Sequence, residues 1–151
     1  MSFFSTLSVS ASALTAQRVR QDVIAENIAN VDTTRTEDGT PYKRKITLFQ
    51  EIKANDGAFS NYLQKAMSKS DFTTGGGVRV SRIVDDESEG TRVYEPGHPD
   101  ADEDGYLMKP NVNIITEMVN MIAATRSYEA NITAMNATKS MIAKTMELTS
   151  R

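Results

Sequence analysis

The sequence predicts a mainly α-helical protein with a small β part, an α+β fold in which long N- and C-terminal helices pack as a coiled-coil pair. Three observations predict it. Apolar residues recur at steps of four and three near the C-terminus, the first thirty residues lack Gly and Pro, and β-like segments occur only between these two regions. We therefore expect a discontinuous helical domain, residues 1–34 and 111–151, and a central β-containing segment with a long acidic loop, residues 35–110.

The N-terminal helix is predicted to have a wide and weak apolar stripe. Its many alanines favour helix and allow a second helix to approach closely. The side chains that we expect to pack from this helix are Leu7, Leu14, Ile24 and Ile28.

The C-terminal helix is predicted from Asn113, its N-cap, to Ser150. At about 1.5 Å of rise per residue it would be roughly 57 Å long, more than a chain of this size needs to cover one core. Its stripe comprises Ile114, Met118, Met121, Thr125, Tyr128, Ile132, Met135, Lys139, Ile142 and Met146. Thr125 and Lys139 interrupt the stripe, and we expect them to meet polar groups of a neighbouring subunit.

Spacing alone leaves two interpretations of the paired stripes open. The two helices bury their apolar faces against each other within one molecule, or they exchange these faces between subunits. The near-neutral charge of both ends and the excess length of the second helix favour assembly.

The central segment is predicted to begin with a strand between Pro41 and Ile52. It starts with the cluster Lys43-Arg44-Lys45, which we interpret as a solvated face or a salt bridge between subunits. A short helix is expected over residues 58–67, a flexible hinge at residues 75–77, which are three glycines, and a strand over residues 78–84.

An acidic loop of 25 residues follows, from Asp85 to Lys109. It is long and has little periodicity, so we expect it to extend over a neighbouring subunit. The run from Asp100 to Gly105 matches the opening half of an EF-hand loop, but position twelve is Asn111 rather than a bidentate carboxylate. A calcium-binding module is therefore one alternative function, and a free-standing coiled-coil adaptor is another.

Composition argues against catalysis. The chain has no cysteine and a single histidine, His98, so thiol catalysis, Cys-ligated zinc and a catalytic triad within one chain are excluded. We expect no enzyme activity, no cofactor and no metal. A net charge of −3 gives no general reason to expect nucleic-acid binding, and neither a membrane span nor a cleaved signal peptide is predicted.

Several motifs in order resemble those of bacterial flagellar rod and hook axial proteins. The stretch from Ser12 to Thr34 is similar to their N-terminal signature. The stretch from Val93 to Tyr106, with residues 110–113, resembles the proximal-rod members, and residues 117–122 and 126–131 agree. The resemblance covers nearly the whole chain.

This resemblance implies a structural subunit of the basal-body rod, which spans the periplasm, exported by the flagellar type III apparatus without signal cleavage. The implied partners are further copies of the chain, rod subunits of the FlgB, FlgF and FlgG types, and the rod-base adaptor FliE. Subunit packing is then assigned to the four apolar residues named above on the first helix and to Met118, Met121, Tyr128, Ile132, Met135 and Ile142. Register or motif roles are assigned to Asn27, Asn30, Thr33 and Asn131. The loop residues expected to lie between subunits are Tyr94, Pro96, Gly97, His98, Pro99, Asp100, Asp102, Asp104, Gly105 and Tyr106.

Overall fold

A computed structural model describes residues 3–52 and 76–149 of the chain. The elements are α1 (Phe3–Ala29), β1 (Lys45–Glu51), β2 (Val78–Asp85), β3 (Thr91–Tyr94), β4 (Tyr106–Lys109) and α3 (Ile114–Thr149). The predicted α+β class is confirmed, with two long helices and a small β part. The helix predicted over residues 58–67 lies outside the described residues.

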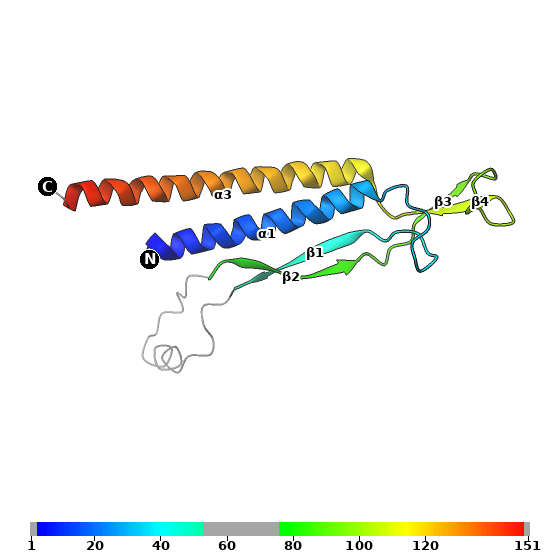
Figure 1. The fold of residues 1–151 in the computed structure, drawn as a ribbon, viewed down its shortest axis with the longest axis horizontal. Helices are drawn as coiled ribbons and strands as arrows, with labels where there is room; N and C mark the ends of the chain where they lie inside the picture. Colours follow the sequence, from blue (N-terminus) through cyan, green and yellow to red (C-terminus); the bar gives the residue numbers. More distant parts are fainter. Residues whose placement is uncertain (1–2, 53–75, 150–151) are drawn as a thin grey trace, which may run out of the picture.

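The two long helices form an antiparallel pair, and α1 lies between α3 and the β1–β2 hairpin (Figure 1). Gln21 on α1 donates a hydrogen bond to Thr125 on α3, 3.1 Å away, which fixes the register of the pair. The 36 residues of α3 span about 54 Å. Because α1 is shorter, the end of α3 extends past the first residues of α1 (Figure 1). Neither described helix is long and apolar enough to cross a membrane.

The predicted N-cap of α3 is confirmed, because Asn113 Oδ1 accepts a hydrogen bond from the Thr116 amide at 3.1 Å. At its C-terminal end, α1 is closed by Asn30. The Asn30 amide group donates to the Glu26 carbonyl oxygen at 2.9 Å, and its Oδ1 accepts from the Thr33 hydroxyl at 3.1 Å. The first turn of α3 and the last turn of α1 are therefore each capped by an asparagine side chain that bonds a backbone group.

The face that α3 turns toward α1 differs from the predicted stripe at every second position. The predicted residues that are at least half-buried on this face are Met121, Tyr128, Met135 and Ile142. Between them lie Glu117, Ala124, Asn131 and Thr138, of which three are buried, whereas the predicted Met118, Ile132 and Lys139 are exposed. Small and polar side chains occupy these positions because the Ala- and Ser-rich α1 approaches closely. The large apolar residues one position further along are displaced toward solvent, as Met118 shows with 54% exposure.

The strands β1 and β2 pair antiparallel, with a bulge between Leu48 and Phe49. Ser12 joins this hairpin to α1, because its hydroxyl accepts a hydrogen bond from the Val78 amide at 3.1 Å. Gly77 has a φ of +111° and lies so close to Ser12 that a side chain would collide with it. The hinge prediction is therefore wrong for Gly76 and Gly77, which continue the ladder through hydrogen bonds with Ile52.

The predicted irregular loop from Asp85 to Lys109 contains a second hairpin, formed by β3 and β4, that projects beyond the helical pair (Figure 1). The prediction missed it because each strand has only four residues. Tyr94 and Tyr106 face each other across the ladder with ring centroids 5.2 Å apart, and Arg92 lies 4.4 Å from the Tyr106 ring centroid. Gly105, with φ +77°, lies at the turn that leads into β4.

Candidate assembly site

A buried polar junction lies where the end of α1, the start of β1 and the first turn of α3 meet. We define it as Asn27, Tyr42, Arg44, Lys45 and Glu117. Asn27 and Glu117 are 1% exposed and are the largest fully buried side chains in the described part of the chain. Since buried polar groups are costly unless they are paired, the hydrogen bonds of these residues decide what the junction does.

Asn27 satisfies both ends of its amide. Its Nδ2 donates to the Lys45 carbonyl oxygen at 2.9 Å and to Glu117 Oε2 at 3.1 Å. Its Oδ1 accepts from the Tyr42 hydroxyl at 2.9 Å and from the Lys45 amide at 2.8 Å. Asn27 therefore sets the register between α1, β1 and α3 within one chain.

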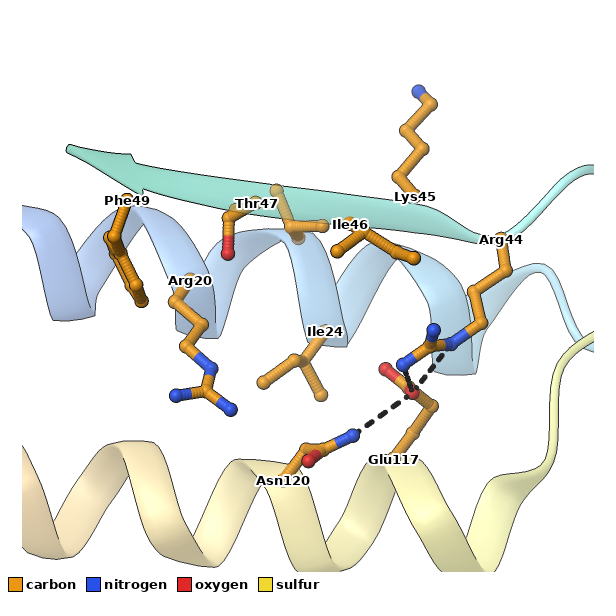
Figure 2. Close-up of a pocket in the computed structure, with 10 residues that line it drawn as sticks. Arg20, Ile24, Arg44, Lys45, Ile46, Thr47, Phe49, Glu117 and Asn120 are labelled. Atoms are coloured by element: carbon orange, nitrogen blue, oxygen red, sulfur yellow. Dashed lines mark hydrogen bonds and ion pairs between the residues drawn. The ribbon is translucent and has the colours of Figure 1, made fainter. Parts of the chain in front are cut away.

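Glu117 meets Arg44 in a charge-assisted pair. The Arg44 Nε and Nη2 atoms donate to Glu117 Oε1 at 2.9 and 2.7 Å, and Asn120 donates to the same oxygen at 3.3 Å (Figure 2). Burial lowers the pKa of Arg44, but its hydrogen bonds to Glu117 and Asp86 and the negative charges of these two carboxylates together outweigh burial and raise that pKa overall. Burial, followed by the negative charges of Glu26, Asp85 and Glu117, raises the pKa of Tyr42 to about 12.

The network continues from Arg44 toward β2. Arg44 Nη1 pairs with Asp86 at 3.3 Å, and hydrogen bonds from Ser88 hold the pKa of the Asp86 carboxyl below its usual range. Asn111 Oδ1 accepts from the Arg44 amide at 2.7 Å, and its Nδ2 donates to the carbonyl oxygens of Asp86 and Ser88. Position twelve of the EF-hand match is thus occupied by a side chain that ties the residue before β1 to the segment after β2.

The carboxylates of the EF-hand match also face different partners. Asp100 accepts a hydrogen bond from the Thr34 hydroxyl at 2.8 Å, and Asp102 pairs with Arg92 at 3.9 Å. Across residues 3–52 and 76–149, no three His, Asp or Glu side chains gather as they would around a metal ion.

A cavity of about 240 Å³ opens beside the junction, between β1 and α3. Arg20 and Ile24 of α1 form its floor, Phe49 of β1 lines one end, and Glu117 of α3 lines the other (Figure 2). Arg20 lies 5.9 Å from the Phe49 ring centroid. The cavity holds no arrangement of nucleophile, base and acceptor.

The prediction that the basic cluster forms a solvated face or a salt bridge between subunits is wrong for two of its three members. Arg44 pairs within the chain as described, and Lys45 pairs with Glu26. Only Lys43 is exposed. No local pattern predicts this pairing, because Arg44 and Glu117 are 73 residues apart in the chain.

The register residues other than Asn27 make local contacts. Asn30 and Thr33 close α1, and Asn131 donates to the Ser127 carbonyl oxygen one turn earlier at 2.8 Å. Thr125 was expected to meet a neighbouring subunit, but it is hydrogen-bonded to Gln21 of the same chain, so this prediction is wrong. Lys139 is exposed.

The predicted packing residues divide into two sets. One set is buried or half-buried within the chain and comprises Leu7, Leu14, Ile24, Ile28, Met121, Tyr128, Met135 and Ile142. The other is exposed and comprises Met118 and Ile132, at 54% and 38%.

An exposed apolar patch lies at the start of α3, and three more exposed apolar side chains lie near its end. The start patch comprises Ile115, Met118, Val119 and Ile122, which are 74%, 54%, 60% and 60% exposed. At about 100° per residue these four side chains share the face opposite the contact with α1. Near the end of α3, Met141, Met146 and Leu148 are 54%, 68% and 72% exposed. At about 100° per residue, Met146 lies on the side of the α1 contact, whereas Met141 and Leu148 lie about 140–160° around the helix from it. Sequence reasoning missed most of the start patch because it placed all apolar residues on one seam.

The predicted intersubunit loop forms the tip and strands of the β3–β4 hairpin. Tyr94 is 63% exposed and Tyr106 is 38% exposed, while Gly105 is buried. The His98 ring accepts a hydrogen bond from the Asp100 amide at 3.1 Å, which shapes the turn. The remaining predicted residues of the loop are exposed and comprise Pro96, Gly97, Pro99, Asp102 and Asp104.

Comparison with known proteins gives the family. A family model described as "Flagella basal body rod protein" matches residues 7–35, and one described as "Flagellar basal body rod FlgEFG protein C-terminal" matches residues 103–148. The flagellar basal-body rod protein FlgC of Bacillus subtilis is 49% identical over 152 residues, covering 98% of this chain and 99% of that protein. The chain belongs to the FlgC family of flagellar basal-body rod proteins.

Other FlgC proteins match at similar coverage. That of Borreliella burgdorferi is 46% identical over 93% of both chains, and that of Escherichia coli O6:H1 is 39% identical over 98% of both. Family membership makes the chain a structural subunit of the proximal rod in the flagellar basal body, and not an enzyme. The resemblance stated from the sequence is thereby confirmed.

Proposed function

We propose that the chain builds the rod wall through residues 1–34 and 111–151, while residues 35–110 form the outer part of the subunit. The single observation that carries this proposal is the start patch, four large apolar side chains that are more than half exposed on the face of α3 opposite α1. A monomer that already pairs its two helices has no further use for such a face. A neighbouring subunit that covers it removes this apolar surface from water.

The predicted packing residues then act at two levels. The buried set, for example Ile24 and Tyr128, holds α1 against α3 inside each subunit, and the exposed set, for example Met118, carries packing between subunits. The polar junction keeps the helical pair and the β1–β2 hairpin in one fixed relation. Copies with the same relation present the same surfaces, which helical assembly requires.

The β3–β4 hairpin is the proposed contact of the outer part with a neighbouring subunit. It projects beyond the helices (Figure 1) and carries Tyr94 and Met108 at 63% and 44% exposure. Neighbours of the rod type, the subunits FlgB, FlgF and FlgG, and the adaptor FliE are the proposed partners. We further propose that the chain passes through the flagellar type III export apparatus without signal cleavage and that the finished rod spans the periplasm.

Gene deletion with electron microscopy of basal bodies tests the function. The deletion strain should lack rods and motility, and the wild-type gene should restore both. A gene that lacks the codons for residues 96–105, the hairpin tip, should restore neither rods nor motility when introduced into the deletion strain, although the shortened chain is still made and exported. Normal motility with this variant would refute the role of the hairpin, and normal rods in the deletion strain would refute the proposed function itself.

A further inference from the structure

The β3–β4 hairpin lies apart from the other elements of the chain. The backbone of β3 and β4 does not come close to that of any other described helix or strand, and the hairpin projects beyond the helical pair (Figure 1). Since no neighbouring element supports it along its length, its direction relative to α1 depends on the segments at its base and on its loop, residues 95–105.

The base of the hairpin is cross-linked by Asn111, which follows β4. Asn111 Nδ2 donates to the carbonyl oxygens of Asp86 and Ser88, which precede β3, at 3.0 Å each. Asn111 Oδ1 also accepts from the Arg44 amide at 2.7 Å, which ties the base to the polar junction. The base thus fixes where the hairpin starts, but one fixed end alone allows the hairpin to tilt about it.

The loop of the hairpin meets the loop that follows α1, and each loop is closed by its own hydrogen bonds. After α1, the Tyr42 amide donates to the Thr33 carbonyl oxygen at 3.1 Å. In the hairpin loop, the Ala101 amide donates to the His98 carbonyl oxygen at 3.1 Å, and the Asp100 amide donates to His98 Nδ1 at 3.1 Å. Two loops that each keep one shape present fixed groups to each other.

Asp100 joins these two loops. Its carboxylate accepts a hydrogen bond from the Thr34 hydroxyl at 2.8 Å and pairs with Arg35 Nη1 at 3.7 Å. In the part of the chain that the structure describes, every hydrogen bond or ion pair between the two loops ends on this carboxylate. The Asp100 side chain is 25% exposed and has exchanged most of its water for these contacts, whereas Arg35 is 71% exposed and adds little. We call Thr34, Arg35 and Asp100 the Asp100 clamp.

We propose that the Asp100 clamp is a releasable contact that holds the β3–β4 hairpin in one direction relative to α1, and that the hairpin tilts about its base when the clamp opens. A hydrogen bond to a charged acceptor favours the closed form by about 10- to 150-fold. Opening returns the carboxylate and the Thr34 hydroxyl to water, and it requires no strand pairing or helix contact to break.

The clamp acts within a single chain and does not depend on the proposed function. In the proposed rod it has one consequence, because a hairpin that is already held in one direction needs less ordering when a neighbouring subunit binds it. Asp100 is then a positioning residue for the contact between subunits.

Spin-label distances in the purified full-length chain test the clamp, and the cysteine-free sequence makes the labelling specific. The reporting pair is Met108→Cys on β4 with Ala123→Cys on α3, and the reference pair is Ile83→Cys on β2 with the same α3 label. All three native side chains are exposed. With the clamp intact, double electron–electron resonance should give one narrow distance distribution for each pair.

Asp100→Ala and Thr34→Val each remove one side of the central hydrogen bond. In both variants the reporting pair should gain a broad second population, and the ratio of clamped to released hairpin should fall about tenfold or more. Thr34→Ser keeps the hydroxyl, and Asp104→Ala removes an exposed carboxylate of the same loop. Both controls should keep the narrow distribution.

A narrow reporting distribution in Asp100→Ala would overturn the proposal, because the base and the packing of the buried Leu107 would then hold the hairpin without the clamp. Broadening of the reference pair in the same variant would also overturn it, since the substitution would then loosen the whole fold. The proposed function fails separately. If the distances respond as expected while the deletion strain builds normal rods, the clamp stands and the function in the rod is wrong.

Discussion

Neutralising Glu117 tests whether the polar junction holds the subunit together. In Glu117→Gln the shape is kept, but the two hydrogen bonds from Arg44, at 2.7 and 2.9 Å, lose the negative charge of their acceptor. Glu117 is 1% exposed and Arg44 is 23% exposed, so the pair is mostly shielded from water. Breaking a buried pair costs about 3–5 kcal/mol, and the remaining exposure of Arg44 and its second partner Asp86 reduce this to about 2–3 kcal/mol.

Urea denaturation of the purified chain, followed by circular dichroism, measures this loss. For a chain of this length the same loss corresponds to a fall in Tm of roughly 5–10 °C. The matched control is Glu129→Gln on the same helix, whose ion pair with Arg126 joins side chains that are 56% and 80% exposed. The control should cost about 0.3–0.5 kcal/mol or less.

Equal losses for Glu117→Gln and Glu129→Gln would refute the reasoning. A double-mutant cycle with Arg44→Gln adds a second check. Because the guanidinium is then absent, Glu117→Gln should cost far less in the Arg44→Gln background than in the wild type. Additive losses would mean that the two side chains do not act as a pair.

Three further outcomes are expected. In urea denaturation, Gly77→Ala should lower the free energy of unfolding by about 2 kcal/mol or more, because the new methyl group collides with the Ser12 hydroxyl on α1. The control Gly39→Ala is also at positive φ but has open space around it, and it should cost only about 1 kcal/mol. Asn27→Ala should cost about 2–3 kcal/mol by the same assay, because two donors lose their acceptor, and Asn131→Ala, which loses one local bond, should cost less than about 1 kcal/mol. The pKa of Tyr42 is raised from 10.0 to about 12 in the folded state. The contribution of its protonated hydroxyl to the free energy of unfolding is therefore fully present below pH 10 and should be lost as the pH rises through about 12. Urea midpoints measured across this pH range should fall less steeply for Tyr42→Phe than for the wild type.

The helices were predictable from the sequence because each element carries its own local signal. Asn113 caps α3 as its side chain and position suggest, and the absence of Gly and Pro in α1 leaves helix as the favoured state. The strand β2 was likewise indicated by alternation after three glycines, and β1 by the apolar residues that follow the basic cluster. The β3–β4 hairpin was missed, because four-residue strands carry too few alternations to show a periodicity.

The polar junction was not predictable, because its members become neighbours only in the folded chain. Asn27 was singled out by a motif, but its partners Tyr42 and Arg44 carried no signal beyond an aromatic side chain and a basic cluster. Glu117 lies in the first turn of α3, where an acid favours the helix dipole, and it is also the buried counter-ion of Arg44. Such pairings depend on tertiary contact and not on spacing.

The split of the predicted stripe on α3 explains how one helix serves two purposes. If Met118 and Ile122 faced α1, large side chains would hold the two helices apart and Glu117 would lie in solvent without Arg44. With Ala124 and Thr138 at the contact instead, the helices approach closely, and the large apolar residues of the start patch are left outside. The monomer thus buries less apolar surface than it would if these side chains faced α1. Within one chain the fold is therefore stabilised mainly by close helix contact and the polar junction. In the proposed rod, a neighbouring subunit covers the start patch and removes this apolar surface from water.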